Sequence, residues 1–254
     1  MMIDMHVHGM AHGEFVFSEE KLSRFLKEAE KKGIKVMGFS EHSWYLKKID
    51  LGVIDNVKKL FPHIRVCLGL EVDHVPNMDR EIIEKIASLP FDYVIGSVHE
   101  IEGWMFDNPQ YADGFKHWDI DALYEKYFSL VGNLIESGIY DVIGHLDLIK
   151  IYGHRPTKRI EDFVVPVLKK AAQRNMIVEI NTSGLYKPVK EIYPSFRILK
   201  LCRSLGVKVT VGSDAHRPEH VGRDILPALE LLKKVGFREI VSFENRKPVY
   251  HPID

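Results

Sequence analysis

The chain has few cysteines, only two among 254 residues. Cys67 lies in an apolar, strand-like run and Cys202 in a helical pattern, so both are expected to be reduced and buried. Two isolated cysteines exclude the disulfide framework that holds many small secreted domains together. They also disfavour a structural zinc site built from thiolates.

Net charge and long apolar runs are also lacking. Lys and Arg total 35 against 36 Asp and Glu, so the surface as a whole should attract neither nucleic acid nor membranes. No apolar run approaches the roughly 20 residues that span a bilayer, and no secretory leader pattern opens the chain. We therefore expect a cytoplasmic protein. The oligomeric state stays open.

Short apolar runs alternate with longer stretches of helical periodicity. The runs lack a strict polar alternation, which is typical of parallel strands buried on both faces. After a first strand leading to His6, they occupy residues 35–40, 65–70, 93–98, 141–145, 176–180 and 208–213. Amphipathic patterns predict helices at 18–33, 79–89, 120–138, 164–175, 195–206 and 224–236.

Repeated strand–helix units imply parallel strands joined by right-handed crossovers, in an open doubly wound sheet or a closed barrel. No Gly-rich phosphate loop follows the first strand, which weakens the nucleotide-binding open sheet. No linker or repeat divides the chain, so residues 1–254 are predicted to form one α/β domain. The aromatic segment 100–120 is interpreted as a long loop or lid over one end of a barrel.

Histidines and carboxylates recur where the strands are expected to end. Between His6 and Asp214 they return about every 35 residues, which is roughly one strand–helix unit. Because the carboxyl ends of all barrel strands meet at one face, these side chains should share a pocket. They are His6, His8, Glu41, His42, Glu71, Asp73, His74, His99, His145, Asp147, Glu179, Asn181, Asp214 and His216.

Two of these pairs have the spacing that places both side chains on one side of a strand: His6 with His8, and Asp214 with His216. Imidazole and carboxylate together suit Zn, Fe or Mn. One histidine at a strand end is usually structural, but ligand-type residues at seven successive strand ends indicate a polynuclear metal site. Four histidines fall outside the pattern and are predicted to be surface or structural residues: His63, His117, His154 and His251.

Six motifs together resemble the PHP (polymerase and histidinol phosphatase) family, and the resemblance runs over essentially the whole chain. They are "HVHGMAHG", "FSEH", "GLEVDHVP", "GSVHEIEG", "GHLDLIK" and "GSDAH". The C-terminal third is most similar to the monofunctional histidinol-phosphate phosphatases of that family. The resemblance implies a distorted (β/α)7 TIM-like barrel, a trinuclear metal centre at the C-terminal ends of its strands, and hydrolysis of L-histidinol phosphate.

The resemblance also implies a ligand set for three divalent ions (Zn, Fe or Mn). The first ion would be held by His6, His8, Glu71 and Asp214, the second by the bridging Glu71 with His99 and His145, and the third by His12, His42 and His216. In the family, the segment between the His-X-His pair and the next histidine is commonly one residue longer. Glu14 therefore remains an alternative to His12.

The ligands suit phosphate ester hydrolysis, because metal ions neutralise phosphate oxygens and lower the pKa of bound water toward about 7. Asp214 and His216 are candidates to relay a proton to the leaving alkoxide. Lys150, Arg155 and Lys187 follow strand-end motifs and are candidates to bind the phosphate, with solvated surface charge as the alternative for each.

Other roles remain open at this point. Glu41 and Asp147 would orient imidazoles or simply cap loops, and Glu102, Trp104 and Phe106 are candidates to contact the imidazole and ammonium of the substrate. The competing functions are a PHP-type phosphodiesterase or exonuclease, another small-molecule phosphoesterase, and a non-catalytic metal-buffering or phosphate-sensing module. A nuclease should show a basic track with interleaved aromatics, which the balanced charge does not favour.

Overall fold

The computed structural model describes residues 1–253, apart from the side chain of Asp79, so Asp254 of the predicted domain lies outside the described residues. In this part of the chain seven parallel strands form one sheet in the order β1-β2-β3-β4-β7-β8-β9. The strands are β1 Met2–Val7, β2 Ile34–His42, β3 Arg65–Asp73, β4 Tyr93–Ser97, β7 Val142–Ile143, β8 Ile177–Asn181 and β9 Val209–Gly212.

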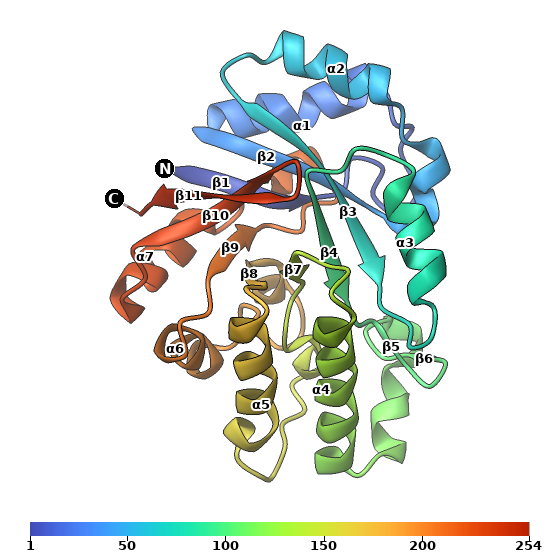
Figure 1. The fold of residues 1–254 in the computed structure, drawn as a ribbon, viewed down its shortest axis with the longest axis vertical. Helices are drawn as coiled ribbons and strands as arrows, with labels where there is room; N and C mark the ends of the chain where they lie inside the picture. Colours follow the sequence, from blue (N-terminus) through green and yellow to red (C-terminus); the bar gives the residue numbers. More distant parts are fainter. Residues whose placement is uncertain (254) are drawn as a thin grey trace.

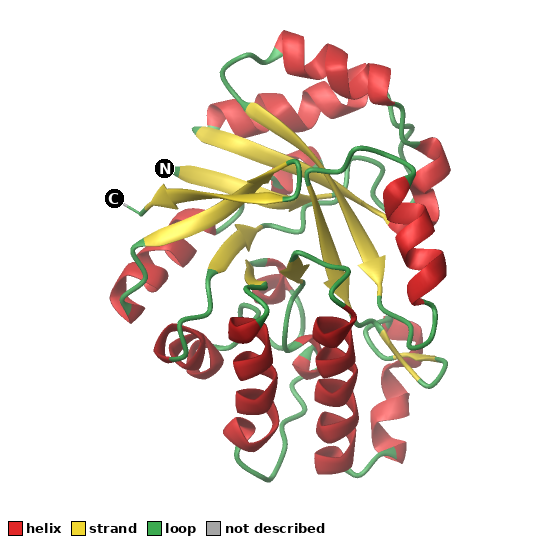
Figure 2. Ribbon diagram, viewed as in Figure 1, coloured by secondary structure: helices red, strands yellow, loops and turns green. Residues whose placement is uncertain are grey.

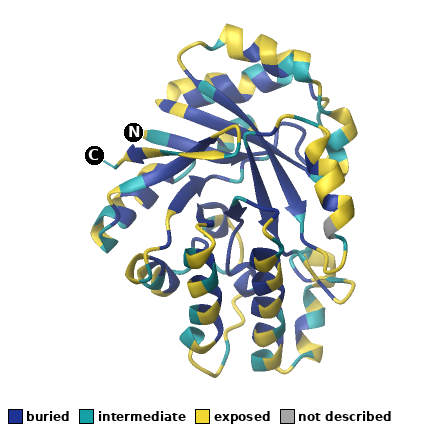
Figure 3. Cartoon of the chain, in the orientation of Figure 1, coloured by how far each residue is buried: buried dark blue, intermediate teal, exposed yellow. Residues whose placement is uncertain are grey.

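Helices surround the strands on the outside (Figures 1 and 2). They are α1 Glu19–Lys31, α2 Leu51–Leu60, α3 Asp79–Ala87, α4 Ile120–Ser137, α5 Ile160–Gln173, α6 Phe196–Ser204 and α7 Ile225–Val235. Their inner faces and the strands are buried, while their outer faces are exposed (Figure 3). The predicted distorted (β/α)7 barrel is therefore confirmed. Among the described residues, no helix has both the length and the apolar character needed to cross a membrane.

The ring of strands is closed by a short parallel contact between β1 and the residues after β9. The amide of His8 donates to the carbonyl of Ala215 at 2.8 Å, and the amide of Ala215 donates to the carbonyl of His6 at 3.2 Å. On the opposite side of the barrel the strand pairing is short, because β7 has only two residues and pairs with β4 through two register positions. The short β7 and the minimal closure make the barrel distorted.

The barrel interior is filled from one side by Tyr93 of β4. Its hydroxyl donates to the carbonyl of Met5 at 2.6 Å. A Cβ at Gly38 or Gly69 would lie 2.0 or 2.4 Å from the Tyr93 side chain, so β2 and β3 need glycine where the ring crosses them. The Tyr93 ring also stacks on Phe243, with the ring centroids 5.6 Å apart.

Phe243 belongs to a C-terminal hairpin, β10 Glu239–Glu244 and β11 Lys247–Pro252, that the sequence patterns did not predict. The hairpin closes the amino-terminal end of the barrel, since Arg65 at the start of β3 donates to the carbonyl of Phe243. The two chain ends lie close together (Figure 1), and the terminal amine is 3.4 Å from the carbonyl of Pro252. The functional end of the barrel is therefore the opposite one.

Two other sequence predictions need correction, and one helix was missed. Segment 100–120 is not an irregular loop: it contains the hairpin β5 Glu100–Ile101 and β6 Trp104–Met105 and the 3-10 segment η2 Pro109–His117. Helix α5 begins at Ile160 rather than at residue 164. Helix α2 was not predicted, because its apolar positions Ile54 and Val57 form only a short buried stripe.

A buried carboxylate near the closure suggests a stability test. Asp4 is fully buried and accepts hydrogen bonds from the amide and hydroxyl of Ser213 and from the amide of Gly222. Asp4→Ala leaves these donors unpaired, so we expect the free energy of unfolding to fall by about 2–4 kcal/mol. Urea denaturation measures the change. Asp55→Ala, on the exposed face of α2, is the control, and equal stability of the two variants would contradict the role of Asp4.

Candidate metal centre

The predicted ligands meet at the carboxyl ends of the strands, around a cavity of about 310 Å³. This volume suits a small organic molecule. The cavity is lined by His12, His42, Glu71, His99, Asp107, His145, Leu148, Ile151, Ser183, Tyr186, Lys187, Asp214, His216, His220 and Arg223. The convergence of residues from β2 through the loop after β9 is what the strand-end pattern predicted.

Glu71, near the end of β3, lies at the middle of the cluster. Its Oε2 atom is 3.6 Å from His6 Nε2, 3.5 Å from His8 Nε2 and 2.9 Å from His42 Nδ1. Its Oε1 atom is 3.1 Å from His145 Nε2 and 3.7 Å from His99 Nε2. The two oxygens of one buried carboxylate thus face two different sets of imidazoles, as a ligand that bridges two ions would.

The donor atoms form three overlapping groups in which all atoms lie within 4.8 Å of one another. The groups are His6, His8 and Glu71; Glu71, His99 and His145; and His8, His42 and His216. Asp214 borders the first group, with its Oδ1 atom 3.4 Å from His8 Nε2 and 3.8 Å from His6 Nε2. Imidazole and carboxylate donors in this arrangement suit a borderline divalent cation such as zinc.

Several buried imidazole nitrogens in this cluster have no hydrogen-bond partner among the described residues. They are His6 Nε2, both nitrogens of His8, His42 Nε2, His145 Nδ1 and His216 Nε2. His99 Nε2 and His145 Nε2 also face each other at 3.2 Å. Buried polar atoms are rarely left unpaired, so these lone pairs fit a site that holds cations.

Two carboxylates orient the imidazoles, and sequence reasoning had given neither of them this role. Glu179 Oε1 lies 2.5 Å from His6 Nδ1, and its Oε2 accepts from the amide of His145 at 2.8 Å. Asp73 bonds His99 Nδ1 in the same way. A carboxylate on Nδ1 fixes the tautomer and directs the Nε2 lone pair toward the metal. Their positions at strand ends were the only signal in the sequence.

The imidazole-orienting role considered for Glu41 and Asp147 is wrong. Glu41 accepts hydrogen bonds from the amides of Gly9 and Met10, so it caps the loop after β1. Burial raises the pKa of this carboxyl to about 8. Asp147 accepts from the amide of Ser195 and pairs with Lys150. Both residues therefore cap loops, which is the second role that the sequence allowed for them.

The electrostatics of the cluster keep its carboxylates ionised and attract positive charge, whether a proton or a metal ion. Burial raises the pKa of Asp214, but His6 and His8 outweigh it and the net pKa lies well below the ordinary value. Burial lowers the pKa of His216 to about 4, which leaves the imidazole neutral. Burial also opposes protonation of His6, yet the charges of Glu179, Asp214 and Glu71 raise its pKa. Metal ions bind ionised carboxylates and neutral imidazoles, and the carboxylates around His6 make its position favourable for a positive charge.

Asp214 follows β9 in a strained conformation. Its φ of 53° lies in the left-handed region, which non-glycine residues rarely adopt. Ser183 Oγ and Asn181 Nδ2, from the end of β8, lie 3.1 and 3.4 Å from Asp214 Oδ2. These contacts hold the carboxylate so that its other oxygen, Oδ1, faces His6 and His8.

His12 lies at the mouth of the cavity. Its ring centroid is 4.4 Å from that of His216 and 5.6 Å from that of His42. Glu14 is exposed and is not among the lining residues. The structure therefore places His12, and not Glu14, beside His42 and His216.

Comparison with known proteins now identifies the fold family. The family model of the PHP domain matches residues 4–183, and that of a PHP-associated region matches residues 195–224. The chain belongs to the PHP domain family. The PHP domain match begins at Asp4, two residues before His6, and includes the strands from β2 to β8.

Similar proteins within this family are named as phosphatases. A probable histidinol-phosphatase of Deinococcus radiodurans is 31% identical, over 97% of this chain and 98% of that protein. The histidinol-phosphatase of Lactococcus lactis is 27% identical, over 96% and 95%. A crystal structure of histidinol phosphate phosphatase from Lactococcus lactis, complexed with zinc, L-histidinol and phosphate, matches with a TM-score of 0.79 and 26% identity over 98% of both chains.

Two of the three predicted phosphate-binding residues lie away from the PHP metal centre. The Nζ atom of Lys150 is 3.0 Å from both Asp147 Oδ2 and Glu191 Oε2, and Arg155 also pairs with Glu191. Both cations line a separate cavity of about 340 Å³. The assignment of Lys150 and Arg155 to the phosphate is therefore corrected, because their charge is directed to internal carboxylates.

Lys187, the third candidate, lines the metal cavity, together with Arg223, which sequence reasoning missed. The guanidinium carbon of Arg223 lies 3.3 Å from the centroid of the Tyr186 ring. The hydroxyl of Thr182 donates to the carbonyl of Arg223 at 2.7 Å. No sequence motif marks Arg223, which follows η5 Pro218–His220 in a loop.

The candidates in segment 100–120 also lie outside the cavity lining. Phe106 is fully buried, Trp104 packs on Phe115, and Glu102 pairs with Lys126 at 2.6 Å. The residue of this segment that does line the cavity is Asp107. Adjacent residues of an irregular segment can point in different directions, so composition alone could not select the right one.

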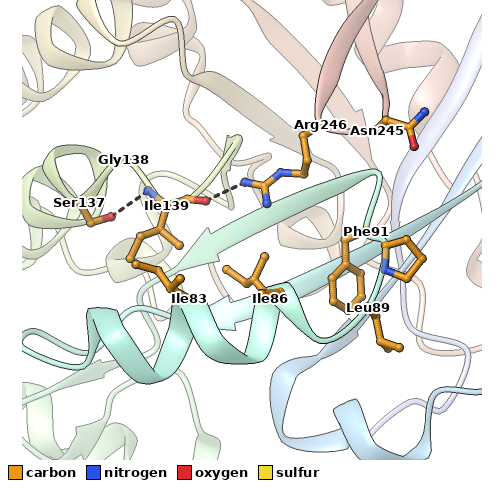
Figure 4. Close-up of a pocket in the computed structure, with 11 residues that line it drawn as sticks. Ile83, Ile86, Leu89, Phe91, Ser137, Gly138, Ile139, Asn245 and Arg246 are labelled. Atoms are coloured by element: carbon orange, nitrogen blue, oxygen red, sulfur yellow. Dashed lines mark hydrogen bonds between the residues drawn. The ribbon is translucent and has the colours of Figure 1, made fainter.

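A larger cavity of about 560 Å³ lies near the amino-terminal end of the barrel, between α3, the end of α4 and the turn of the C-terminal hairpin (Figure 4). Its walls are mainly apolar, and its lining includes Ile83, Ile86, Phe91 and Ile139. None of its lining residues belongs to the three donor groups. In this class of barrel, catalysis takes place at the opposite face.

The orienting role of Glu179 can be tested by Glu179→Gln. The amide keeps the shape of the side chain but removes the charge that fixes His6, so we expect metal affinity to fall by about 10- to 100-fold. Competition with a chelator, followed by elemental analysis, measures the affinity. Glu239→Gln, which alters an exposed pair with Lys208, is the matched control. Equal affinity of the two variants would contradict the assignment.

Proposed function

We propose that the chain is a metal-dependent phosphomonoesterase that hydrolyses L-histidinol phosphate to L-histidinol and phosphate. The observation that carries the proposal is the convergence of histidines and carboxylates from successive strand ends on one cavity. The similarity to a histidinol phosphate phosphatase solved with zinc, L-histidinol and phosphate supports the choice of substrate.

We further propose that the centre holds three divalent ions. His6, His8, Glu71 and Asp214 would hold the first, Glu71 with His99 and His145 the second, and His12, His42 and His216 the third. Such ions neutralise the oxygens of a phosphate ester and lower the pKa of water. The overlap of the donor groups at Glu71 and His8 supports closely spaced ions.

The residues of the chain would handle the proton that the leaving alkoxide needs. His216 Nδ1 is 3.0 Å from the carbonyl of Asp214 and 3.5 Å from its Oδ1. This contact orients the ring and leaves Nε2 as the other nitrogen, which has no partner among the described residues. We assign the relay to Asp214 or to His216 Nδ1, because an imidazole nitrogen that holds a cation carries no proton and Nε2 is the nitrogen left for the ion.

Phosphate binding is assigned to Lys187 with Arg223, because both line the cavity beside the ligand groups. Among the described residues, neither side chain has a carboxylate within the distance of an ion pair. Stacking on Tyr186 restricts the Arg223 guanidinium and reduces the entropy lost when it binds an anion.

Substrate class is tested by incubating the metal-loaded protein with L-histidinol phosphate and, separately, with a dinucleotide diester. We expect phosphate release from the monoester and no cleavage of the diester. His145→Ala should abolish turnover while circular dichroism stays that of the wild type, and His63→Ala, an exposed histidine outside the cluster, should remain active. Hydrolysis of the diester would instead support a nuclease, and the absence of hydrolysis with both substrates would support a non-catalytic module.

The role of Lys187 gives a separate prediction. Lys187→Ala removes one charge-assisted hydrogen bond to the phosphate, so we expect KM to rise by roughly tenfold with a smaller change in kcat. Steady-state kinetics measures both constants. Lys169→Ala, an exposed lysine of α5, is the control, and an unchanged KM would remove Lys187 from the site.

A further inference from the structure

The Asp107 carboxylate lies in the cavity but outside the three groups of metal donors. Asp107 lines the cavity, and its Oδ1 atom is buried without a hydrogen-bond partner among the described residues. We infer that Asp107 is the specificity-determining residue that binds a cationic nitrogen group of the substrate, an ammonium or imidazolium. This inference rests on the proposed phosphatase function and adds the part of the site that selects the alcohol side of the ester.

The chain holds Asp107 in place on both sides. Phe106 is fully buried and contacts the ring of Tyr127 edge-on, with the ring centroids 5.7 Å apart. The hydroxyl of Tyr152 donates to the carbonyl of Asp107 at 2.8 Å. The backbone at Asp107 is therefore fixed before a ligand arrives, and a fixed binding group loses little entropy on binding.

The other carboxylates that line the cavity already have imidazole partners. Glu71 and Asp214 both contact imidazoles of the donor groups. Asp107 belongs to none of these groups and has no ion pair among the described residues. A buried carboxylate oxygen without a partner costs free energy, and a ligand that donates a charged hydrogen bond removes that cost.

The distribution of charge around the cavity agrees with this role. Lys187 and Arg223 come from the segments that follow β8 and β9, whereas Asp107 comes from the segment that follows β6. The cavity thus offers cations for a phosphate and a separate anion for a nitrogen group. A substrate with a phosphate on one end and a protonated nitrogen on the other matches both.

The experiment compares two esters with wild type, Asp107→Asn and Asp107→Ala. L-Histidinol phosphate carries the nitrogen groups, and phenyl phosphate has a ring but no cation. For both variants we expect kcat/KM to fall by on the order of 10- to 100-fold with L-histidinol phosphate, and to change less than about twofold with phenyl phosphate. Asp113→Asn, an exposed aspartate of the same segment that pairs with Lys116, is the matched control.

The outcomes separate this inference from the proposed function. A fall in kcat/KM with both esters, or a loss of bound metal measured by elemental analysis, would make Asp107 a structural or metal-site residue. Either result would overturn the inference and leave the proposed function standing. Undiminished turnover of L-histidinol phosphate by Asp107→Asn would also overturn it alone. Wild-type protein that hydrolyses phenyl phosphate but not L-histidinol phosphate would overturn both the substrate assignment and the inference.

Discussion

The metal centre depends on one buried carboxylate, Glu71, whose two oxygens face imidazoles on opposite sides. A carboxylate taken out of water costs several kcal/mol unless positive charge or hydrogen bonds compensate. Ser97 Oγ supplies one hydrogen bond, at 2.7 Å from Oε1, and the surrounding imidazoles bring lone pairs as well as protons. The arrangement is therefore most stable when cations lie between Glu71 and the nitrogens. Metal binding at this residue would therefore be coupled to folding.

Barrel closure is what brings the first and last ligands together. His6 is on the first strand, His8 follows it directly and Asp214 lies in the loop after the last strand, and they meet only because the backbone near Val7 pairs with Ala215. Asp4 reinforces the closure through Ser213 and Gly222. The same few residues therefore complete both the fold and the metal site, so a weakened closure should disturb the ligands before it disturbs the distant helices.

Much of this could be predicted from the sequence, because period and register are local properties. The apolar runs gave the strands, and ligand-type residues about one strand–helix unit apart gave the metal cluster. Roles that depend on side-chain direction could not be predicted. Lys150 follows a ligand motif, yet it turns toward Asp147 and Glu191, while Arg223 lies in a loop without a motif. Glu179 was visible at a strand end, but only the folded chain shows it beside His6 Nδ1.

The site divides its chemistry between two kinds of structure. The candidate metal donors lie at strand ends, where parallel pairing fixes their positions, and in the proposed function they would act on the phosphate. The other groups proposed to meet the substrate lie in the segments after β6, β8 and β9: Asp107 for the nitrogen group, and Lys187 and Arg223 for the phosphate. Because loops accept substitutions that strands do not, a barrel of this kind can change its alcohol specificity while keeping the metal centre intact. In this chain the packing of Phe106 and the hydrogen bond from Tyr152 hold the backbone at Asp107, and a carboxylate held in place is what the proposed discrimination between a charged and a neutral ester requires.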